Sequence, residues 1–306
     1  MKTEQLRHAL AGVPEATRER FIAFHEQNPV RRLDVGGHTL EYIAFGRGDR
    51  VILHLPGLLS NADAAVYLVP LADRARILSV TYLPTSDTGA QLQAFLRLLD
   101  AEHVSRAAVL GQTLGGHLAQ CFTGAHPDRV SELVVAHAGL PLREEIQMRQ
   151  VNLLYGLMHG VPFPLIRQVL TRPLLAGVQR AGQHPDIEPG QAALIQAYFA
   201  LRQAKLDRRT TLARYGLLRD VARVFPEKYR AGLASWPGRT LVMYSRGQWC
   251  NEHHVARMRE LLTGLTAHTQ DAGAHWNLYL LPEASSRLVG NFLGLPEARE
   301  KRGLAT

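Results

Sequence analysis

Short apolar runs alternate with amphipathic stretches along the first half of the chain. Four runs are typical of buried strands, because each is rich in Val, Leu, Ile or Ala and ends at turn-forming residues: VILHL at 51–55, ARILSVTYLP at 75–84, RAAVLG at 106–111 and ELVVAHAG at 132–139. Residues 89–104 and 113–128 have helical periodicity. Strands and helices that alternate at this spacing predict a parallel sheet with right-handed crossovers.

The segments before the first buried run have different patterns. Residues 1–29 alternate charged and apolar positions, which predicts a helical extension that ends near Asn28–Pro29, because proline disfavours helix at the residue before it. The following stretch, RRLDVGGHTLEYIAFG at 31–46, contains two alternating runs around Gly36–Gly37. This pattern predicts a β-hairpin.

The second half of the chain begins with a long helical stretch. Residues 142–236 have apolar faces at helical spacing and contain no convincing strand. A strand at 240–245, a helix at 253–265, a polar strand at 266–270 and a helix at 284–294 complete the pattern. A helical insertion in a parallel sheet most simply covers the carboxyl ends of the strands, where open α/β sheets bind ligands.

These patterns divide the chain into four parts. We expect an N-terminal helical extension at 1–29, the first part of an α/β core at 30–141, a helical cap at 142–237 and the second part of the core at 238–306. No internal repeat or low-complexity segment interrupts this organisation.

Composition and charge change this picture little. The 306 residues are 46% hydrophobic and 20% charged, which is ordinary for a globular protein, and the net charge is +8. A positive charge can indicate a nucleic-acid partner, but the arginines are scattered among acidic residues and the longest basic clusters are pairs, Arg31–Arg32 and Arg208–Arg209. We therefore expect a solvated basic surface and no nucleic-acid partner.

The sequence also bears on location, metals and assembly. No apolar run is long enough to span a membrane, and the N-terminus lacks the apolar segment of a secretory signal, so a cytoplasmic protein is expected. Cys121 and Cys250 have no metal-binding or disulfide spacing and are expected to be reduced packing residues. Nothing indicates a metal or a cofactor, and the oligomeric state stays open.

The stretch VLGQTLGG at 109–116 carries the clearest chemical signal. A buried strand runs into G-x-T-x-G-G and then into a helix, which is the layout of a nucleophile elbow. Glycines are needed because the strand and helix backbones approach so closely that side chains would clash. The central residue, Thr113, is expected at positive φ, with its hydroxyl above a helix N-terminus whose amides can stabilise negative charge.

The chain resembles α/β-hydrolase-fold proteins from about residue 33 to 296. LGQTLGGHLAQCF with HPDRVSELVV resembles the family's elbow, helix and next strand, LPGLLSNAD resembles its oxyanion loop, and DAGAHWNLYLLPE resembles its histidine loop. Within the superfamily these segments are most similar to the maspardin branch, which is described more as a binding or adaptor group than as proven enzymes. The resemblance implies a mostly parallel central sheet flanked by helices, with a helical cap.

The resemblance also implies the roles of four residues. Thr113 occupies the nucleophile position, where the family has serine, and His275 occupies the histidine position. The backbone amides of Leu58 and Leu114 would form the oxyanion hole. Threonine can act as a nucleophile when a base activates it, although its methyl group is costly at positive φ and crowds an incoming carbonyl group.

The acid of the triad is the main departure from the family. The residues after the strand at 240–245 read SRGQWCNEHH, so Gln248 stands where an aspartate is expected. Glu252 lies four residues beyond Gln248, and Asp271 lies four residues before His275, so either could substitute. Without an acid, the histidine loses the group that fixes its tautomer and stabilises its charged form. Further candidates for lining the pocket are Gly57, Gln112, Gln248, Trp249 and Trp276.

Three functions follow from this site. The first is hydrolysis of a small apolar ester, thioester or related acyl substrate under the cap by a degenerate triad. The second is a catalytically inactive, maspardin-like binding or adaptor protein that holds a small apolar ligand or a protein partner. The third is a lyase or cyclase step in which Thr113 and His275 act only as acid and base.

Overall fold

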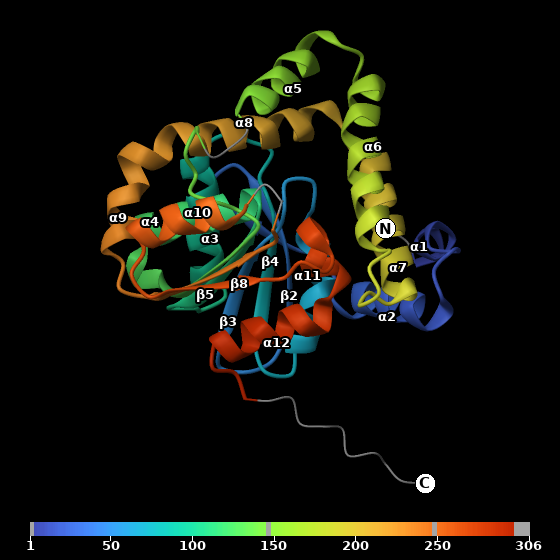
Figure 1. Ribbon diagram of the computed structural model, residues 1–306, viewed down its shortest axis with the longest axis horizontal. Helices are drawn as coiled ribbons and strands as arrows, with labels where there is room; N and C mark the ends of the chain where they lie inside the picture. Colours follow the sequence, from blue (N-terminus) through green and yellow to red (C-terminus); the bar gives the residue numbers. More distant parts are fainter. Residues whose placement is uncertain (1–2, 145–147, 247–249, 297–306) are drawn as a thin grey trace.

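The computed structural model of the chain describes residues 3–144, 148–246 and 250–296 (Figure 1). Within them, eight strands form one sheet in the order β1-β2-β4-β3-β5-β6-β7-β8. Only the pairs β1–β2 and β2–β4 are antiparallel. The strands are β1 Arg31–Asp34, β2 Thr39–Gly46, β3 Val51–Leu55, β4 Arg76–Thr81, β5 Ala107–Gln112, β6 Val130–Ala136, β7 Arg239–Tyr244 and β8 Leu265–Thr269.

Helices cover both faces of this sheet and fill the long interval between β6 and β7. The α-helices are α1 Thr3–Ala9, α2 Glu15–Gln27, α3 Thr88–Ala101, α4 Leu114–Ala125, α5 Met148–Gly160, α6 Phe163–Ala181, α7 Pro189–Ala204, α8 Arg208–Val224, α9 Arg230–Ser235, α10 Glu252–Leu261, α11 Asn277–Leu280 and α12 Pro282–Phe292. Short helical turns complete the set: η1 Ala62–Leu71, η2 Pro127–Arg129, η3 Phe225–Tyr229 and η4 Ala274–Trp276.

The parallel sheet and the hairpin predicted from the sequence are confirmed. The hairpin joins β1 to β2 with Leu33 opposite Leu40, and β2 then adds antiparallel to β4. In the region 1–29, where the sequence predicted a helical extension, the described residues form two helices, α1 and α2. Residues 10–14 separate them, and Pro14 has ψ 138° and therefore stands outside the helical conformation immediately before α2.

The apolar faces of the strands form two cores, one on each side of the sheet. On one side, strand residues pack with side chains from α3, α4, α8, α9 and α10, among them the buried Phe95 and Phe122. On the other side, they pack with side chains from α2, η1, α7, α11 and α12, among them Phe21 and Tyr67. Strands buried on both faces explain the near-continuous apolar runs in the sequence.

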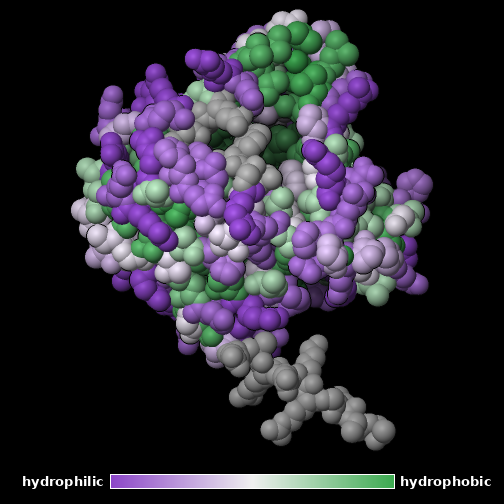
Figure 2. Space-filling view, in the orientation of Figure 1, coloured by the Kyte–Doolittle hydropathy of each residue, from purple (hydrophilic) through white to green (hydrophobic). Residues whose placement is uncertain are grey.

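The helices α5 and α6 stand farthest from the sheet (Figure 1). Figure 2 shows a concentration of apolar surface over this pair, where Leu153, Leu157, Leu165 and Val169 are exposed. At the other end of the insertion, α9 packs closely on α4, since a Cβ atom at Gly232 would lie 2.1 Å from the carbonyl oxygen of Gly124. Among the described residues, no helix combines the length and apolar character that a membrane crossing requires.

Candidate functional site

The turn between β5 and α4 has the geometry of an elbow. Thr113 has φ 50° and ψ −114°, so the positive φ expected from the sequence is confirmed. A Cβ atom at Gly111 would lie 2.1 Å from the carbonyl oxygen of Gly115, and one at Gly115 would lie 1.9 Å from that of Leu55. Both positions therefore admit only glycine without a backbone shift.

Thr113 is held in this conformation by backbone hydrogen bonds on both sides. Its N–H donates to the carbonyl oxygen of Ala136 in the next strand at 2.9 Å, and its carbonyl oxygen accepts from the N–H of His117 at 3.1 Å. A β-branched residue at positive φ stores strain of order ~1–3 kcal/mol, and such strain concentrates at functional sites. The turn thus fixes one hydroxyl at the carboxyl end of a central strand.

The loop after β3 brings a backbone amide to this hydroxyl. The N–H of Leu58 donates to Thr113 Oγ1 at 3.3 Å, and a Cβ atom at Gly57 would lie 3.1 Å from the same oxygen. Leu114 is buried as the first residue of α4, where an N–H has no acceptor within the helix. The structure therefore brings Gly57 and Leu58 to Thr113.

The carbonyl groups of the same loop are fixed by side chains from other elements. Arg214 of α8 donates through Nη1 to the carbonyl oxygen of Leu58 at 2.9 Å. The hydroxyl of Tyr82 donates to the carbonyl oxygen of Pro56. With its carbonyls anchored in this way, the loop presents the Leu58 N–H in a fixed direction.

His275 lies on η4, between β8 and α11. Its side chain is partly buried, and its ring centroid lies 5.1 Å from that of His137 and 5.0 Å from that of Trp276. Desolvation, and then the proximity of His137, lower the pKa of His275 to about 3. The imidazole is therefore neutral at neutral pH, as a general base must be.

His137 was not identified from the sequence. It follows β6 directly with φ 54°, it is 4% exposed, and burial lowers its pKa to about 4. The amide of Asn277 donates to the Gln270 carbonyl oxygen, so Asn277 Oδ1 is left to accept from His137 Nε2 at 2.8 Å. His137 Nδ1 is buried and has no hydrogen-bond partner among the residues described. The sequence offered one signal for His137, because it lies near the carboxyl end of the strand predicted at 132–139 and the carboxyl ends of parallel strands meet at one edge of the sheet.

The structure places the candidate acids as follows. Asp271 is paired with Arg246, whose Nε donates to Oδ2 at 2.7 Å and whose N–H donates to Oδ1 at 2.9 Å. These hydrogen bonds hold the pKa of Asp271 below its usual value. Glu252 is exposed in the first turn of α10, while Gln248 and Trp249 lie outside the described residues. At the end of β7, Ser245 donates to the Gln270 carbonyl oxygen at 2.7 Å.

The remaining pocket candidates join the site to the inserted helices. Trp276 packs edge-to-face on Phe199 of α7, with ring centroids 5.1 Å apart, and a Cβ atom at Gly177 of α6 would lie 3.3 Å from its Nε1. Gln112 is 1% exposed, and its Oε1 has no hydrogen-bond partner within the described part of the chain. A buried amide oxygen without a partner is unusual, which marks Gln112 as a group able to accept a hydrogen bond from a ligand.

Comparisons with known proteins divide sharply. No protein-family model matches the chain, and no curated protein sequence matches it. Solved structures do resemble it. An esterase, EaEST, from Exiguobacterium antarcticum has a TM-score of 0.67 at 19% identity, covering 85% of this chain and 97% of its own. A hydrolase from Pseudomonas aeruginosa has a TM-score of 0.67 at 20% identity, and the match covers 87% of this chain and 98% of the hydrolase. A loop variant of a haloalkane dehalogenase from Bradyrhizobium elkanii has a TM-score of 0.63 at 17% identity, and the match covers 87% of this chain and 96% of the dehalogenase.

Proposed function

We propose that this chain, which has the α/β-hydrolase fold, hydrolyses a small apolar ester or thioester with Thr113 as its nucleophile. One observation carries the proposal. The Thr113 hydroxyl stands on a strained, glycine-enclosed turn, and the Leu58 N–H points at it from 3.3 Å. A scaffold without chemistry has no need to hold a β-branched residue at positive φ.

The reaction would proceed by acyl transfer. Thr113 Oγ1 attacks the carbonyl carbon while His275 accepts its proton, and the N–H groups of Leu58 and Leu114 stabilise the oxygen that becomes negative. The bond to the leaving alcohol or thiol then breaks, and His275 returns the proton to that group. Water, deprotonated by His275, attacks the acyl-threonine, releases the carboxylic acid and restores the hydroxyl.

Two features of the site predispose it to slow turnover. The Leu58 N–H must exchange Thr113 Oγ1 for the substrate oxygen before it can stabilise the transition state. A base whose pKa lies near 3 also accepts a proton less readily than one tuned near neutrality. We therefore expect slow ester hydrolysis that proceeds through an acyl-enzyme.

The substrate class follows from the side chains around His275. Trp276 packs on Phe199, and Phe199 in turn packs on Tyr279 with ring centroids 5.3 Å apart. An aromatic wall of this kind favours an apolar acyl or alcohol group over a charged one. The helices α6 and α7, which contact Trp276, serve as the cap in this proposal.

The test is covalent labelling of purified protein with a fluorophosphonate probe, read by peptide mass spectrometry. We expect label on Thr113, loss of label in Thr113→Ala, and loss of 4-nitrophenyl ester hydrolysis in His275→Gln. Thr123→Ala is the matched control, because Thr123 lies on α4, the helix that follows Thr113, and donates its hydroxyl to the Ala119 carbonyl oxygen. Absence of label together with hydrolysis independent of His275 would overturn the proposal.

A second function is favoured by the hydrogen bond between Leu58 and Thr113. That bond occupies the donor that an oxyanion needs, so the hydroxyl could act without attacking, either by contacting a bound ligand or as an acid–base group in a lyase or cyclase step. The maspardin-like assignment belongs to this alternative. In this alternative the fluorophosphonate probe does not label the unchanged protein. An apolar ligand should still raise the thermal stability of the Thr113→Ala variant.

A further inference from the structure

A groove of about 600 Å³ is lined by Asn61, from the loop that also carries Leu58, and by Arg214, whose guanidinium contacts that loop. Its walls come from β1, β2, the end of β4, the loop before η1, and the adjoining ends of α7 and α8. Neither Thr113 nor His275 is among the described residues that line it. The groove is therefore separate from the proposed catalytic site, although both share one loop.

The lining carries more positive than negative charge. Four cations face the groove, Arg32, Arg202, Lys205 and Arg214, against the carboxylates of Glu41 and Asp207. Both carboxylates are already engaged. Glu41 pairs with Arg32 at 3.2 Å, and Asp207 accepts the N–H of Thr210 at 2.8 Å as the N-cap of α8.

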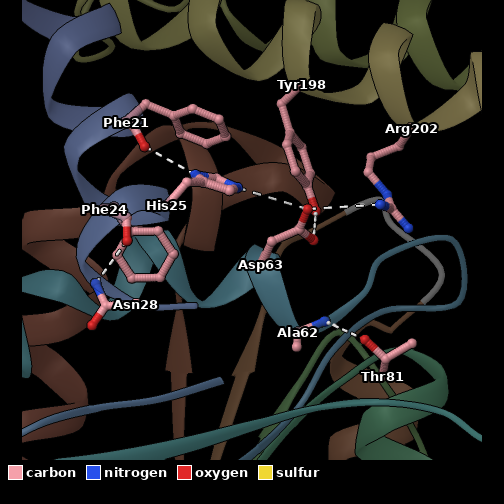
Figure 3. A network of polar contacts seen from close by, with 9 residues as sticks. All are labelled: Phe21, Phe24, His25, Asn28, Ala62, Asp63, Thr81, Tyr198 and Arg202. Carbon is pink, nitrogen blue, oxygen red and sulfur yellow. Dashed lines mark hydrogen bonds and ion pairs between the residues drawn. The ribbon is translucent and has the colours of Figure 1, made fainter. Parts of the chain in front are cut away.

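Arg202 is held toward the groove by a network that also includes the N-terminal helices (Figure 3). Asp63 of η1 lies 3.7 Å from Arg202 Nη1 and accepts the hydroxyl of Tyr198 at 3.1 Å. His25 of α2 approaches the same carboxylate at 3.9 Å. Arg202 is thus positioned by a carboxylate that itself lies outside the lining.

Arg214 is the most buried cation of the groove, with only 3% of its surface exposed. Its two Nη atoms donate to neutral acceptors, the Leu58 carbonyl oxygen and Asn61 Oδ1. Among the described residues no carboxylate forms an ion pair with it, and its Nε is buried without a hydrogen-bond partner. Buried charges in proteins are normally paired. Asp63 attracts this guanidinium from beyond ion-pair distance and is shared with Arg202 and Tyr198, so Arg214 has no carboxylate in direct contact.

We infer that the groove binds a small molecule bearing an oxyanion, a carboxylate or a phosphate, with Arg214 as the main partner and Arg202 and Lys205 beside it. A guanidinium presents N–H groups in a planar fork that matches such oxyanions. The anion would supply the negative charge that the groove lacks. Burial lowers the pKa of Arg214 to about 10, so the side chain still carries its charge at neutral pH.

The site has a direct path to Thr113. Arg214 donates to the Leu58 carbonyl oxygen, and the N–H of the same residue donates to Thr113 Oγ1. An anion bound to the Arg214 guanidinium is therefore connected to the threonine hydroxyl through two residues, Arg214 and Leu58. Binding does not require Thr113 to react, so the inference stands apart from the proposed hydrolysis.

Isothermal titration calorimetry at constant ionic strength tests the inference. Sodium phosphate and sodium benzoate distinguish the two oxyanion classes, and benzamide is the neutral analogue of benzoate. We expect saturable binding of phosphate or benzoate and none of benzamide. Arg214→Gln should weaken binding by about tenfold or more, because a charge-assisted hydrogen bond is lost while an N–H remains for the Leu58 carbonyl group.

Two further variants make the result decisive. Arg209→Gln is the matched control, since Arg209 carries the same charge, is exposed on α8 and does not line the groove. The Arg209→Gln variant should bind the anion with the same affinity as the unchanged protein. Thr210→Glu places a carboxylate four residues before Arg214 on the same helix, where it should compete with the anion.

If Arg214→Gln fails to fold, Thr210→Glu decides in its place. Equal loss in Arg209→Gln and Arg214→Gln would overturn the inference, as would equal binding of benzamide, unchanged binding in Thr210→Glu, or the absence of saturable binding by either anion. Thr113→Ala should retain binding, so a failure of hydrolysis and a failure of this site can be told apart.

Discussion

Lowering the pH from about 8 to about 5 should leave kcat/KM for ester hydrolysis almost unchanged. An ordinary histidine with pKa 6.5 is only about 3% neutral at pH 5, so a reaction that depends on it as a base falls about thirtyfold. The pKa of His275 is about 3, because its surroundings desolvate the ring and His137 stands beside it. The ring then stays about 99% neutral at pH 5.

The assay follows release of acid from a 4-nitrophenyl ester by chromatography at each pH, with a return to the starting pH to confirm reversibility. In parallel, NMR of protein labelled at the histidine Cε1 position reports the titration directly, and His275→Gln assigns the signal. We expect no inflection between about pH 8 and pH 5. An inflection of rate and signal between pH 6 and 7 would refute the reasoning, because it would show an imidazole that water or a carboxylate stabilises in its charged form.

Three further outcomes test the site and the fold. Gly115→Ala should lower the free energy of unfolding in urea by about 3 kcal/mol or more, since the added Cβ would lie 1.9 Å from the Leu55 carbonyl oxygen; an effect below ~1 kcal/mol would contradict the crowded elbow. Thr113→Ser should raise the rate of fluorophosphonate labelling, about tenfold, because it removes the methyl group beside the attacking oxygen; slower labelling would count against attack by Thr113. His54 is buried and its pKa is lowered to about 3, so between about pH 6.5 and pH 3 only the unfolded chain binds the proton and the free energy of unfolding falls as the pH falls. His54→Gln should reduce the loss of unfolding free energy between pH 7 and pH 5 by about 2 kcal/mol in urea titrations. An identical pH dependence in the variant would be inconsistent with a neutral buried ring.

The parts of the protein that the sequence predicted well are those whose signals are local. The elbow was visible because strand, glycines and helix follow one another within 109–116. A Cβ atom at Gly111 would clash with the backbone of Gly115, and one at Gly115 with the backbone of Leu55 in the neighbouring strand. The loop at 55–63 was singled out by its similarity to the family's oxyanion loop, and its Leu58 N–H contacts Thr113 Oγ1; the oxyanion role of this N–H stays a prediction. Burial on both faces of the sheet likewise made the central strands easy to recognise.

The parts that the sequence did not reveal depend on side chains that meet from distant segments. His137 has no local pattern that distinguishes it, and its role near His275 arises only when β6 and η4 come together. Arg214 looks like one more arginine on an amphipathic helix, and its burial and its contact with the Leu58 carbonyl oxygen arise only in the folded chain. Asp271 shows the opposite case, in which spacing made a carboxylate a candidate and the fold paired it with Arg246.

The carboxylate of Asp63 has a consequence for attempts to exchange parts between related folds. It lies on η1 and its partners belong to α2 and α7, and the same α2 helix also places Phe21 against Tyr198, with ring centroids 6.0 Å apart. The inserted helices are therefore not an interchangeable cassette. In a chimera that takes its α5–α8 segment from another protein, Asp63 would lose its partners on α7. The helix α2 and the α5–α8 segment therefore have to be transplanted together.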